Sequence, residues 1–235
     1  MYMSRKPEQK RKEVTRMSGS LMAVFDFDGV LFDDKKFKKD YESLFARAGI
    51  SGELYRKTYD QAKKKGYYDP RVHVKVAAMG KANGSVMEKH LYARLLEFTR
   101  KTGNYIFPDV KEFLTYLGEQ SIRTILLSTG DPVFQNQKIT KSGVSNLFDQ
   151  VIIIPDTSKV FALHAWIKKE QPLSTVFIDD KKLILEEVKR SLLSVYVVQM
   201  RRESTMPAAW HIDGAVHDFA GLKEFIDDWK KEHSG

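Results

Sequence analysis

Five short apolar runs punctuate the chain, and each has the length of a β-strand. The runs are continuous rather than alternating, which is typical of strands covered on both faces in a parallel sheet. Helical patterns lie between several of them, and this alternation predicts a doubly wound α/β fold. The five runs are residues 21–25, 124–127, 151–154, 176–178 and 195–198.

Apolar residues at helical spacing predict the helices between these strands. Val110, Phe113, Leu114 and Leu117 follow the i, i+3, i+4, i+7 pattern of one helix face, after Pro108 and before Gly118. Two further helices are predicted from the same kind of pattern, one with Val160, Leu163 and Ile167 and one with Phe219, Leu222, Ile226 and Trp229.

One long stretch of the sequence does not show the alternation of predicted strands and helices. Residues 35–105 show helical patterns and no convincing strand, and Ser85 with Glu88 resembles the capping box of a helix. We therefore expect an inserted helical lid directly after the first strand. The predicted organisation is a basic tail over residues 1–19, an α/β core over residues 20–34 and 106–235, and a helical cap over residues 35–105.

Composition narrows the class of protein. With 235 residues, 42% apolar and 30% charged, the chain is typical of a water-soluble globular protein. No apolar run approaches a membrane span, and the first twenty residues lack the apolar stretch of a secretory signal. Cysteine is absent, which excludes disulfides and thiolate metal sites and fits a reducing cytosol. We expect a cytoplasmic protein without a membrane anchor, either monomer or homodimer.

The net charge of +8 is uneven. Six Lys/Arg against two Glu in residues 1–17 leave four positive charges in the tail, which would suit a nucleic-acid-binding arm. A solvated extension is the simpler interpretation, because no aromatic residue is interleaved to stack on bases. Lysines of the predicted lid (Lys35, Lys36, Lys38, Lys39 and Lys63 to Lys65) allow the same two interpretations, a solvated face or a surface that guides a polyanion.

Polar residues follow four of the predicted strands. Asp26 follows the first strand, Ser128 the second, Lys159 lies just past the third, and Asp179 and Asp180 end the fourth. Each could be a turn or helix-cap residue on its own. Ligands of open parallel sheets bind outside the carboxyl ends of the strands. These five polar residues, taken together, therefore predict one site at that edge of the sheet. Lys159, near a helix start, also needs an anion nearby, since the helix dipole disfavours a cation there.

These segments resemble the motifs of the haloacid dehalogenase superfamily. The sequence DFDGVL at residues 26–31 is similar to motif I, and ILLS at residues 125–128 is similar to motif II. Lys159 matches the lysine of motif III, and FIDD at residues 177–180 matches the double-acid form of motif IV. The resemblance implies a Rossmann-like core with a helical cap after motif I, and a Mg²⁺-dependent phosphatase.

The resemblance also implies a role for each residue. Asp26 would attack phosphorus to form an aspartyl-phosphate, and Asp28 would act as general acid and base. Mg²⁺ would bind Asp26, Asp180 and the Asp28 carbonyl, with Asp179 reaching it through water. Ser128 would bind a phosphoryl oxygen, with Thr129 as the alternative hydroxyl, and Lys159 would neutralise charge on both Asp26 and the phosphoryl group.

The leading functional hypothesis is hydrolysis of a small phosphorylated metabolite. A phosphomutase using the same aspartyl-phosphate is the first alternative, and a phosphatase that processes nucleic-acid ends is the second. A non-catalytic binding protein is disfavoured, since a scaffold needs none of Asp26, Asp28, Ser128, Lys159 and Asp180. Dehalogenation is disfavoured because it does not require the second acid at Asp28.

Overall fold

The computed structural model describes residues 21–63, 67–155, 158–203, 208 and 210–233. Its centre is a six-stranded, wholly parallel sheet with the strand order β3-β2-β1-β4-β5-β6. The strands are β1 (Leu21–Phe25), β2 (Arg123–Thr129), β3 (Gln150–Ile154), β4 (Ser174–Asp179), β5 (Val195–Met200) and β6 (Gly214–Val216). The predicted doubly wound α/β fold and its first five strands are confirmed.

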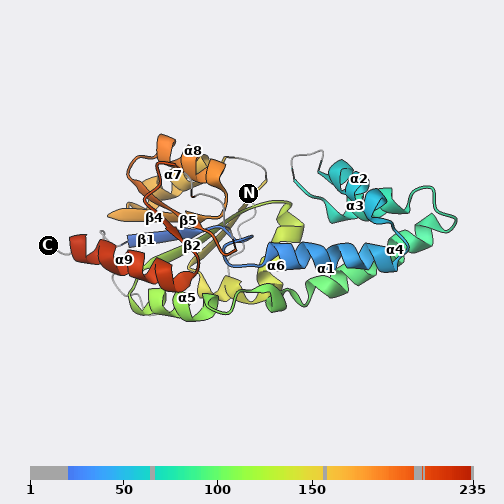
Figure 1. Ribbon diagram of the computed structural model, residues 1–235, viewed down its shortest axis with the longest axis horizontal. Coiled ribbons are helices and arrows are strands. Elements are labelled where there is room, and N and C mark those ends of the chain that lie inside the picture. Colours follow the sequence, from blue (N-terminus) through green and yellow to red (C-terminus); the bar gives the residue numbers. More distant parts are fainter. Residues whose placement is uncertain (1–20, 64–66, 156–157, 204–207, 209, 234–235) are drawn as a thin grey trace.

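Helices cover both faces of the sheet (Figure 1). Successive side chains of β1 point to opposite faces, so Ala23 and Phe25 join one apolar cluster and Met22 and Val24 join the other. The first cluster includes α5 (Val110–Glu119), α6 (Pro132–Ser142) and α9 (Phe219–His233); the second includes α7 (Lys159–Glu170) and α8 (Lys182–Ser191). Burial on both sides explains why the strand sequences are continuously apolar.

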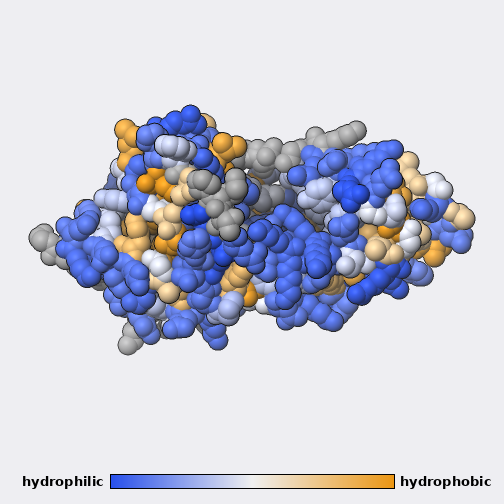
Figure 2. Space-filling model, in the orientation of Figure 1, coloured by the Kyte–Doolittle hydropathy of each residue, from blue (hydrophilic) through white to orange (hydrophobic). Residues whose placement is uncertain are grey.

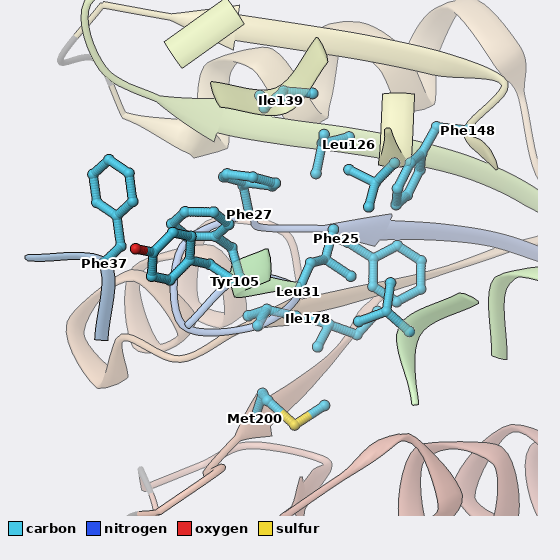
Figure 3. Close-up of a cluster of buried hydrophobic side chains, with 14 of the residues drawn as sticks. Phe25, Phe27, Leu31, Phe37, Tyr105, Leu126, Ile139, Phe148, Ile178 and Met200 are labelled. Carbon is cyan, nitrogen blue, oxygen red and sulfur yellow. The ribbon is translucent and has the colours of Figure 1, made fainter. Parts of the chain in front are cut away.

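Aromatic and aliphatic side chains of the first cluster meet around the centre of the sheet. Figure 3 shows Phe25 of β1 between Leu126 of β2 and Ile178 of β4, with Phe148 beside it. The Phe25 and Phe148 rings meet edge to face at 5.8 Å, a favoured aromatic geometry. This packing fixes the end of β1, which is the strand that leads into the candidate site.

The helical segment between β1 and α5 contains no strand among its described residues. It comprises α1 (Asp34–Arg47), α2 (Gly52–Ala62), α3 (Pro70–Ala78), α4 (Gly84–Thr99) and the short η1 (Thr102–Tyr105). Most of it lies to one side of the sheet (Figure 1). Its two connections to the sheet run side by side, since Asp33 N donates to Tyr105 O at 2.7 Å and Phe107 N to Leu31 O at 3.0 Å. That this segment is a cap domain remains a prediction.

Local sequence signals account for the helix boundaries. Asp33 caps α1, because its side chain accepts a hydrogen bond from Lys36 N at 2.9 Å. Asp69 and Asp131 cap α3 and α6 in the same way, and a proline follows each of these two aspartates. Gly143 ends α6 in a left-handed conformation with φ of 82°. The capping box predicted at Ser85 and Glu88 is wrong, because α4 already begins at Gly84 after Asn83.

The four lysines of α1 are exposed while Phe37 between them is buried, and Figure 2 shows a hydrophilic face over this helix. The interior of the helical segment is aromatic. Its His73 is fully buried and bonded to Tyr68 Oη and Thr58 Oγ1, so it is a core residue. In the described part of the chain, no helix is long and apolar enough to cross a membrane. The predicted basic tail lies outside the described residues.

Candidate active site

The sheet topology brings the sequence-predicted residues to one edge. Strand β1 lies between β2 and β4, with Phe25 level with both Leu126 and Ile178. Asp26 directly follows β1, and its backbone N donates to Ile178 O at 2.9 Å. Asp179 ends β4, Ser128 lies near the end of β2, and Lys159 begins α7 after β3. Four segments that are distant in the sequence therefore meet beside the end of β1.

A buried lysine joins two of the carboxylates. Lys159 Nζ lies 2.8 Å from Asp26 Oδ1 and 2.6 Å from Asp179 Oδ2, and all three residues are at most 2% exposed. The second Asp179 oxygen accepts from Lys181 N at 2.8 Å. The two carboxylates supply the anions that a lysine at a helix N-terminus needs. We refer to Asp26, Lys159, Asp179 and Asp180 as the carboxylate–lysine cluster.

Burial and mutual repulsion shift the pKa values of this cluster. Burial raises the pKa of Asp26 despite the opposing charge of Lys159. Burial, together with the charges of Asp179 and Asp26, raises the pKa of Asp180 to about 7. For Lys159 burial alone would lower the pKa, but Asp26 and Asp179 raise it above the ordinary lysine value, so this side chain is a cation. A bound cation would offset the mutual repulsion of the Asp26, Asp179 and Asp180 carboxylates.

The oxygen atoms of this cluster fit a metal ion. Asp26, Asp179 and Asp180 each offer one carboxylate oxygen, and these oxygens lie within 4.8 Å of one another. Asp26 Oδ2 and Asp180 Oδ1 are buried and accept no hydrogen bond from the described residues. Both Asp179 oxygens already accept hydrogen bonds, one from Lys159 and one from Lys181 N. An all-oxygen set of this kind suits Mg²⁺, with Asp26 and Asp180 as the carboxylates free to bind it directly.

Gly29 allows Asp180 to approach the loop after β1. Its φ of +82° is a left-handed conformation that glycine adopts without strain. A Cβ atom at this position would lie 2.5 Å from Asp180 Oδ2. The glycine after the two aspartates is therefore required by both the backbone and the neighbouring carboxylate.

Asp28 points to a second group of polar residues. Its Oδ1 accepts from Lys138 Nζ at 2.6 Å, and its Oδ2 accepts from Gln135 Nε2 at 2.9 Å. Gln135 Nε2 also donates to Ser128 Oγ at 2.8 Å. Burial would raise the pKa of Asp28, but the charge and hydrogen bond of Lys138 and the hydrogen bond of Gln135 lower it below the ordinary aspartate value. Lys138, Gln135, Asp28 and Ser128 form the amide–lysine network.

Neither Gln135 nor Lys138 was predicted from the sequence as a site residue. Both lie on α6, where a Gln and a Lys three residues apart would ordinarily belong to an exposed helix face. The only available signal was their position just after the loop that follows Ser128. Of the two hydroxyls that the sequence left open, Ser128 is buried and hydrogen-bonded to Gln135, whereas Thr129 is half-buried at the end of β2.

Comparisons with known proteins agree with this architecture. Residues 22–181 match the haloacid dehalogenase-like hydrolase family. No curated protein sequence matches the chain. Among solved structures, a protein of Burkholderia xenovorans described as a haloacid dehalogenase-like hydrolase has a TM-score of 0.70 and 21% identity, covering 90% of this chain and 98% of its own.

Two further structures share the fold at lower identity. A 2-haloacid dehalogenase from Pseudomonas syringae has a TM-score of 0.66 and 13% identity, with 90% of this chain and 99% of the other covered. A haloacid dehalogenase-type hydrolase from Bacillus subtilis, bound to magnesium, has a TM-score of 0.60 and 13% identity, with 88% and 99% covered. At these identities the likeness concerns the fold alone. Since the family match spans more than half of the sequence, the chain belongs to the haloacid dehalogenase-like hydrolases.

Proposed function

We propose that this hydrolase is a Mg²⁺-dependent phosphatase that acts on a small phosphorylated metabolite through an aspartyl-phosphate. The observation that supports this most strongly is the separation of two carboxylates. Asp26 lies in the carboxylate–lysine cluster, whereas Asp28 is turned to Gln135 and Lys138. Because different partners hold the two carboxylates, each can take a separate role, Asp26 as nucleophile and Asp28 as acid–base catalyst.

The first half-reaction transfers the phosphoryl group to the protein. A carboxylate oxygen of Asp26 attacks phosphorus while the bond from phosphorus to the ester oxygen breaks. Lys138 and Gln135 hold Asp28 as a carboxylate in the free protein, so Asp28 must take up a proton before the ester bond breaks. It then gives this proton to the departing oxygen, so that a neutral alcohol leaves. Lys159, 2.8 Å from Asp26, offsets negative charge at the nucleophile and on the phosphoryl oxygens.

The second half-reaction returns Asp26 to its free form. Asp28 takes a proton from a water molecule as the water oxygen attacks phosphorus, and the bond from phosphorus to the Asp26 oxygen breaks. Inorganic phosphate leaves and Asp28 is protonated again. Ser128 is placed to donate its hydroxyl proton to a phosphoryl oxygen in both steps, since its Oγ accepts from Gln135.

A metal ion would be held by Asp26, Asp180 and the backbone carbonyl of Asp28, with Asp179 reaching it through water. The support is the pair of buried oxygens, Asp26 Oδ2 and Asp180 Oδ1, that lack hydrogen-bond donors among the described residues. When bound, Mg²⁺ neutralises charge that develops on the phosphoryl oxygens. The magnesium-bound relative from Bacillus subtilis is compatible with this assignment.

Carbon–halogen hydrolysis is the alternative from a different reaction class, and the relative from Pseudomonas syringae carries that description. A halide leaves without a proton, so such a reaction has no use for an acid at Asp28. The presence of a second carboxylate, Asp28, two residues after Asp26 therefore favours the phosphatase. A phosphomutase would use the same residues and differ only in returning the phosphoryl group to its product.

Phosphate release with and without Mg²⁺ tests the proposal. Wild type and the Asp26→Asn variant would be assayed with sugar phosphates, nucleotides, p-nitrophenyl phosphate and a 3′-phosphorylated oligonucleotide, and halide release would be measured from 2-chloropropionate. We expect phosphate release that disappears with EDTA and in the variant. Chloride release without phosphate release would establish the dehalogenase instead. No product from any compound, with folded protein, would contradict hydrolysis of these substrates.

A further inference from the structure

Both oxygens of Asp28 are held by one helix. Gln135 and Lys138 lie one turn apart on α6 and are 4% and 5% exposed. Lys138 Nζ donates to Asp28 Oδ1 at 2.6 Å and to Gln135 Oε1 at 3.3 Å. Gln135 Nε2 donates to Asp28 Oδ2 and to Ser128 Oγ, so the side-chain amide ties the acid to the hydroxyl.

The surroundings of Lys138 leave its ammonium group little freedom. A buried lysine is tolerated when it is paired, and the partner here is Asp28. The ammonium nitrogen also lies over four aromatic rings, 4.8 Å from the centroid of Phe32, 5.2 Å from Phe37, 5.4 Å from Phe27 and 6.0 Å from Phe134. Ring faces attract cations. The rings therefore fix the charge in one place, and Asp28 is fixed with it.

Lys138 does not duplicate Lys159. The described ion pairs of Asp26 are with Lys159 at 2.8 Å and Lys181 at 3.9 Å, whereas Lys138 pairs with Asp28. Each of the two carboxylates thus has its own buried lysine. No other described side chain forms a hydrogen bond with the Asp28 carboxylate, so its orientation depends on Lys138 and Gln135.

We infer that Gln135 and Lys138 are positioning residues, which set the orientation of the Asp28 carboxylate and the Ser128 hydroxyl relative to Asp26. This inference rests on the proposed function, since it assigns Asp28 a proton to deliver. Reaction rates are sensitive to displacements of about 1 Å in catalytic groups. A carboxylate held at both oxygens meets that requirement, and neither Gln135 nor Lys138 needs to touch the substrate.

The dependence on the leaving group tests this role. An alkyl phosphate needs a proton on its departing oxygen, whereas p-nitrophenolate leaves readily without one. For Lys138→Met we expect kcat/KM to fall about 10- to 100-fold for the best alkyl ester and less than about 10-fold for p-nitrophenyl phosphate. Gln135→Leu, which keeps the lysine, should show the same selectivity. The matched controls are Lys141→Met and Asn136→Ala, both at exposed positions of α6.

A double-mutant cycle separates positioning from general damage. If Lys138 acts through Asp28, Lys138→Met should lower kcat/KM little further in the Asp28→Asn background. Equal losses for alkyl and aryl esters, or full additivity with Asp28→Asn, would overturn the inference. Thermal melting of each variant identifies any that is simply unfolded, and Gln135→Leu then carries the test.

A crystal structure of Lys138→Met gives a readout that does not depend on activity. We expect the Asp28 carboxylate to leave the positions from which it now accepts hydrogen bonds. If wild type releases no phosphate but Asp28 rotates in the variant, the positioning role stands and the proposed function fails. If Asp28 keeps its orientation in Lys138→Met and also in the double variant with Gln135→Leu, the positioning role fails whatever the activity.

Discussion

Asp26 and Asp28 are separated by one residue, yet their carboxylates are paired with lysines from different helices. Lys159 at the start of α7 lies 2.8 Å from Asp26, and Lys138 within α6 lies 2.6 Å from Asp28. These helices lie on opposite faces of the sheet. The two carboxylates are therefore held from two sides, and changes on either face can be expected to affect one of them separately.

Replacing Lys159 with methionine should impair both stability and activity. The substitution leaves Asp26 and Asp179 buried without their shared cation, and breaking a buried ion pair typically costs about 3–5 kcal/mol. We expect a lower free energy of unfolding in urea, and phosphate release reduced by more than about 10²-fold. Lys168→Met, at an exposed position of the same helix, is the control and should change stability by less than about 0.5 kcal/mol. Unchanged turnover in Lys159→Met would contradict the role given to this lysine.

The pKa of Asp180 predicts how the metal-free protein responds to pH. Burial, Asp179 and Asp26 raise this pKa to about 7, above the ordinary aspartate value of about 3.9. The folded state therefore holds a proton that the unfolded chain releases, and this contribution to stability is complete below about pH 4 and lost as pH rises through about 7. Relative to Asp180→Asn, the wild-type Tm in EDTA should fall by a few degrees between about pH 4 and 8. If the difference in Tm between wild type and Asp180→Asn were the same at every pH, the raised pKa of Asp180 would be refuted.

Magnesium should reverse this loss. Carboxylates bind a metal ion in their deprotonated form, so Mg²⁺ should raise the Tm of wild type more at about pH 8 than at about pH 5. Asp180→Asn should lose most of this stabilisation, while Asp228→Asn, an acid on the exposed surface of α9, should keep it. If both variants respond to Mg²⁺ as wild type does, the ion binds elsewhere.

Two glycines with the same backbone conformation allow a controlled test of the loop after β1. Gly29 has φ of +82° and Gly49 has φ of +78°, but only at Gly29 would a Cβ collide with Asp180. Both alanine variants should lose about 1 kcal/mol from left-handed strain. Gly29→Ala alone should also weaken Mg²⁺ binding and lower kcat, because Asp180 must move. Calorimetry of Mg²⁺ binding to both variants checks this, and equal affinities would exclude a role for the close approach.

The choice between Ser128 and Thr129 can be settled by kinetics. Ser128 is buried and linked to Asp28 through Gln135, so Ser128→Ala should lower kcat by about 10²- to 10³-fold, as does the loss of one donor to a developing charge. Thr129→Val should have a much smaller effect. The reverse order of effects would assign the phosphoryl-binding hydroxyl to Thr129.

The core of the fold was predictable because its strands are continuous apolar runs in the sequence. Strand β1 is apolar at all five positions, and a continuous apolar run of this length is typical of a strand that is covered on both faces. Strand β6 was missed because it spans only Gly214–Val216 and has no fully buried residue. The helix start predicted at Ser85 was wrong because a serine three residues before a glutamate can occur inside a helix as well as at its N-terminus.

The site was only partly predictable, for a physical reason. Asp26 follows β1, Asp179 ends β4 and Lys159 lies after β3. Parallel strands bring these ends together, so topology alone groups the three side chains. Gln135 and Lys138 lie within a helix, where what a polar side chain contacts depends on how the helix sits on the sheet. Their burial among Phe27, Phe32, Phe37 and Phe134 arises from packing that no local spacing encodes.

The place of β1 in the sheet also governs when activity can arise during synthesis. Leu21 pairs with Ser174, so the strand that leads to Asp26 has no neighbour on one side until β4 has left the ribosome. Contacts this distant in sequence form late. A nascent chain that has emerged only as far as α6 would carry Asp26 and Asp28 but not Lys159, Asp179 or Asp180. On the proposed function, we therefore expect the growing polypeptide to gain activity only after its second half has emerged.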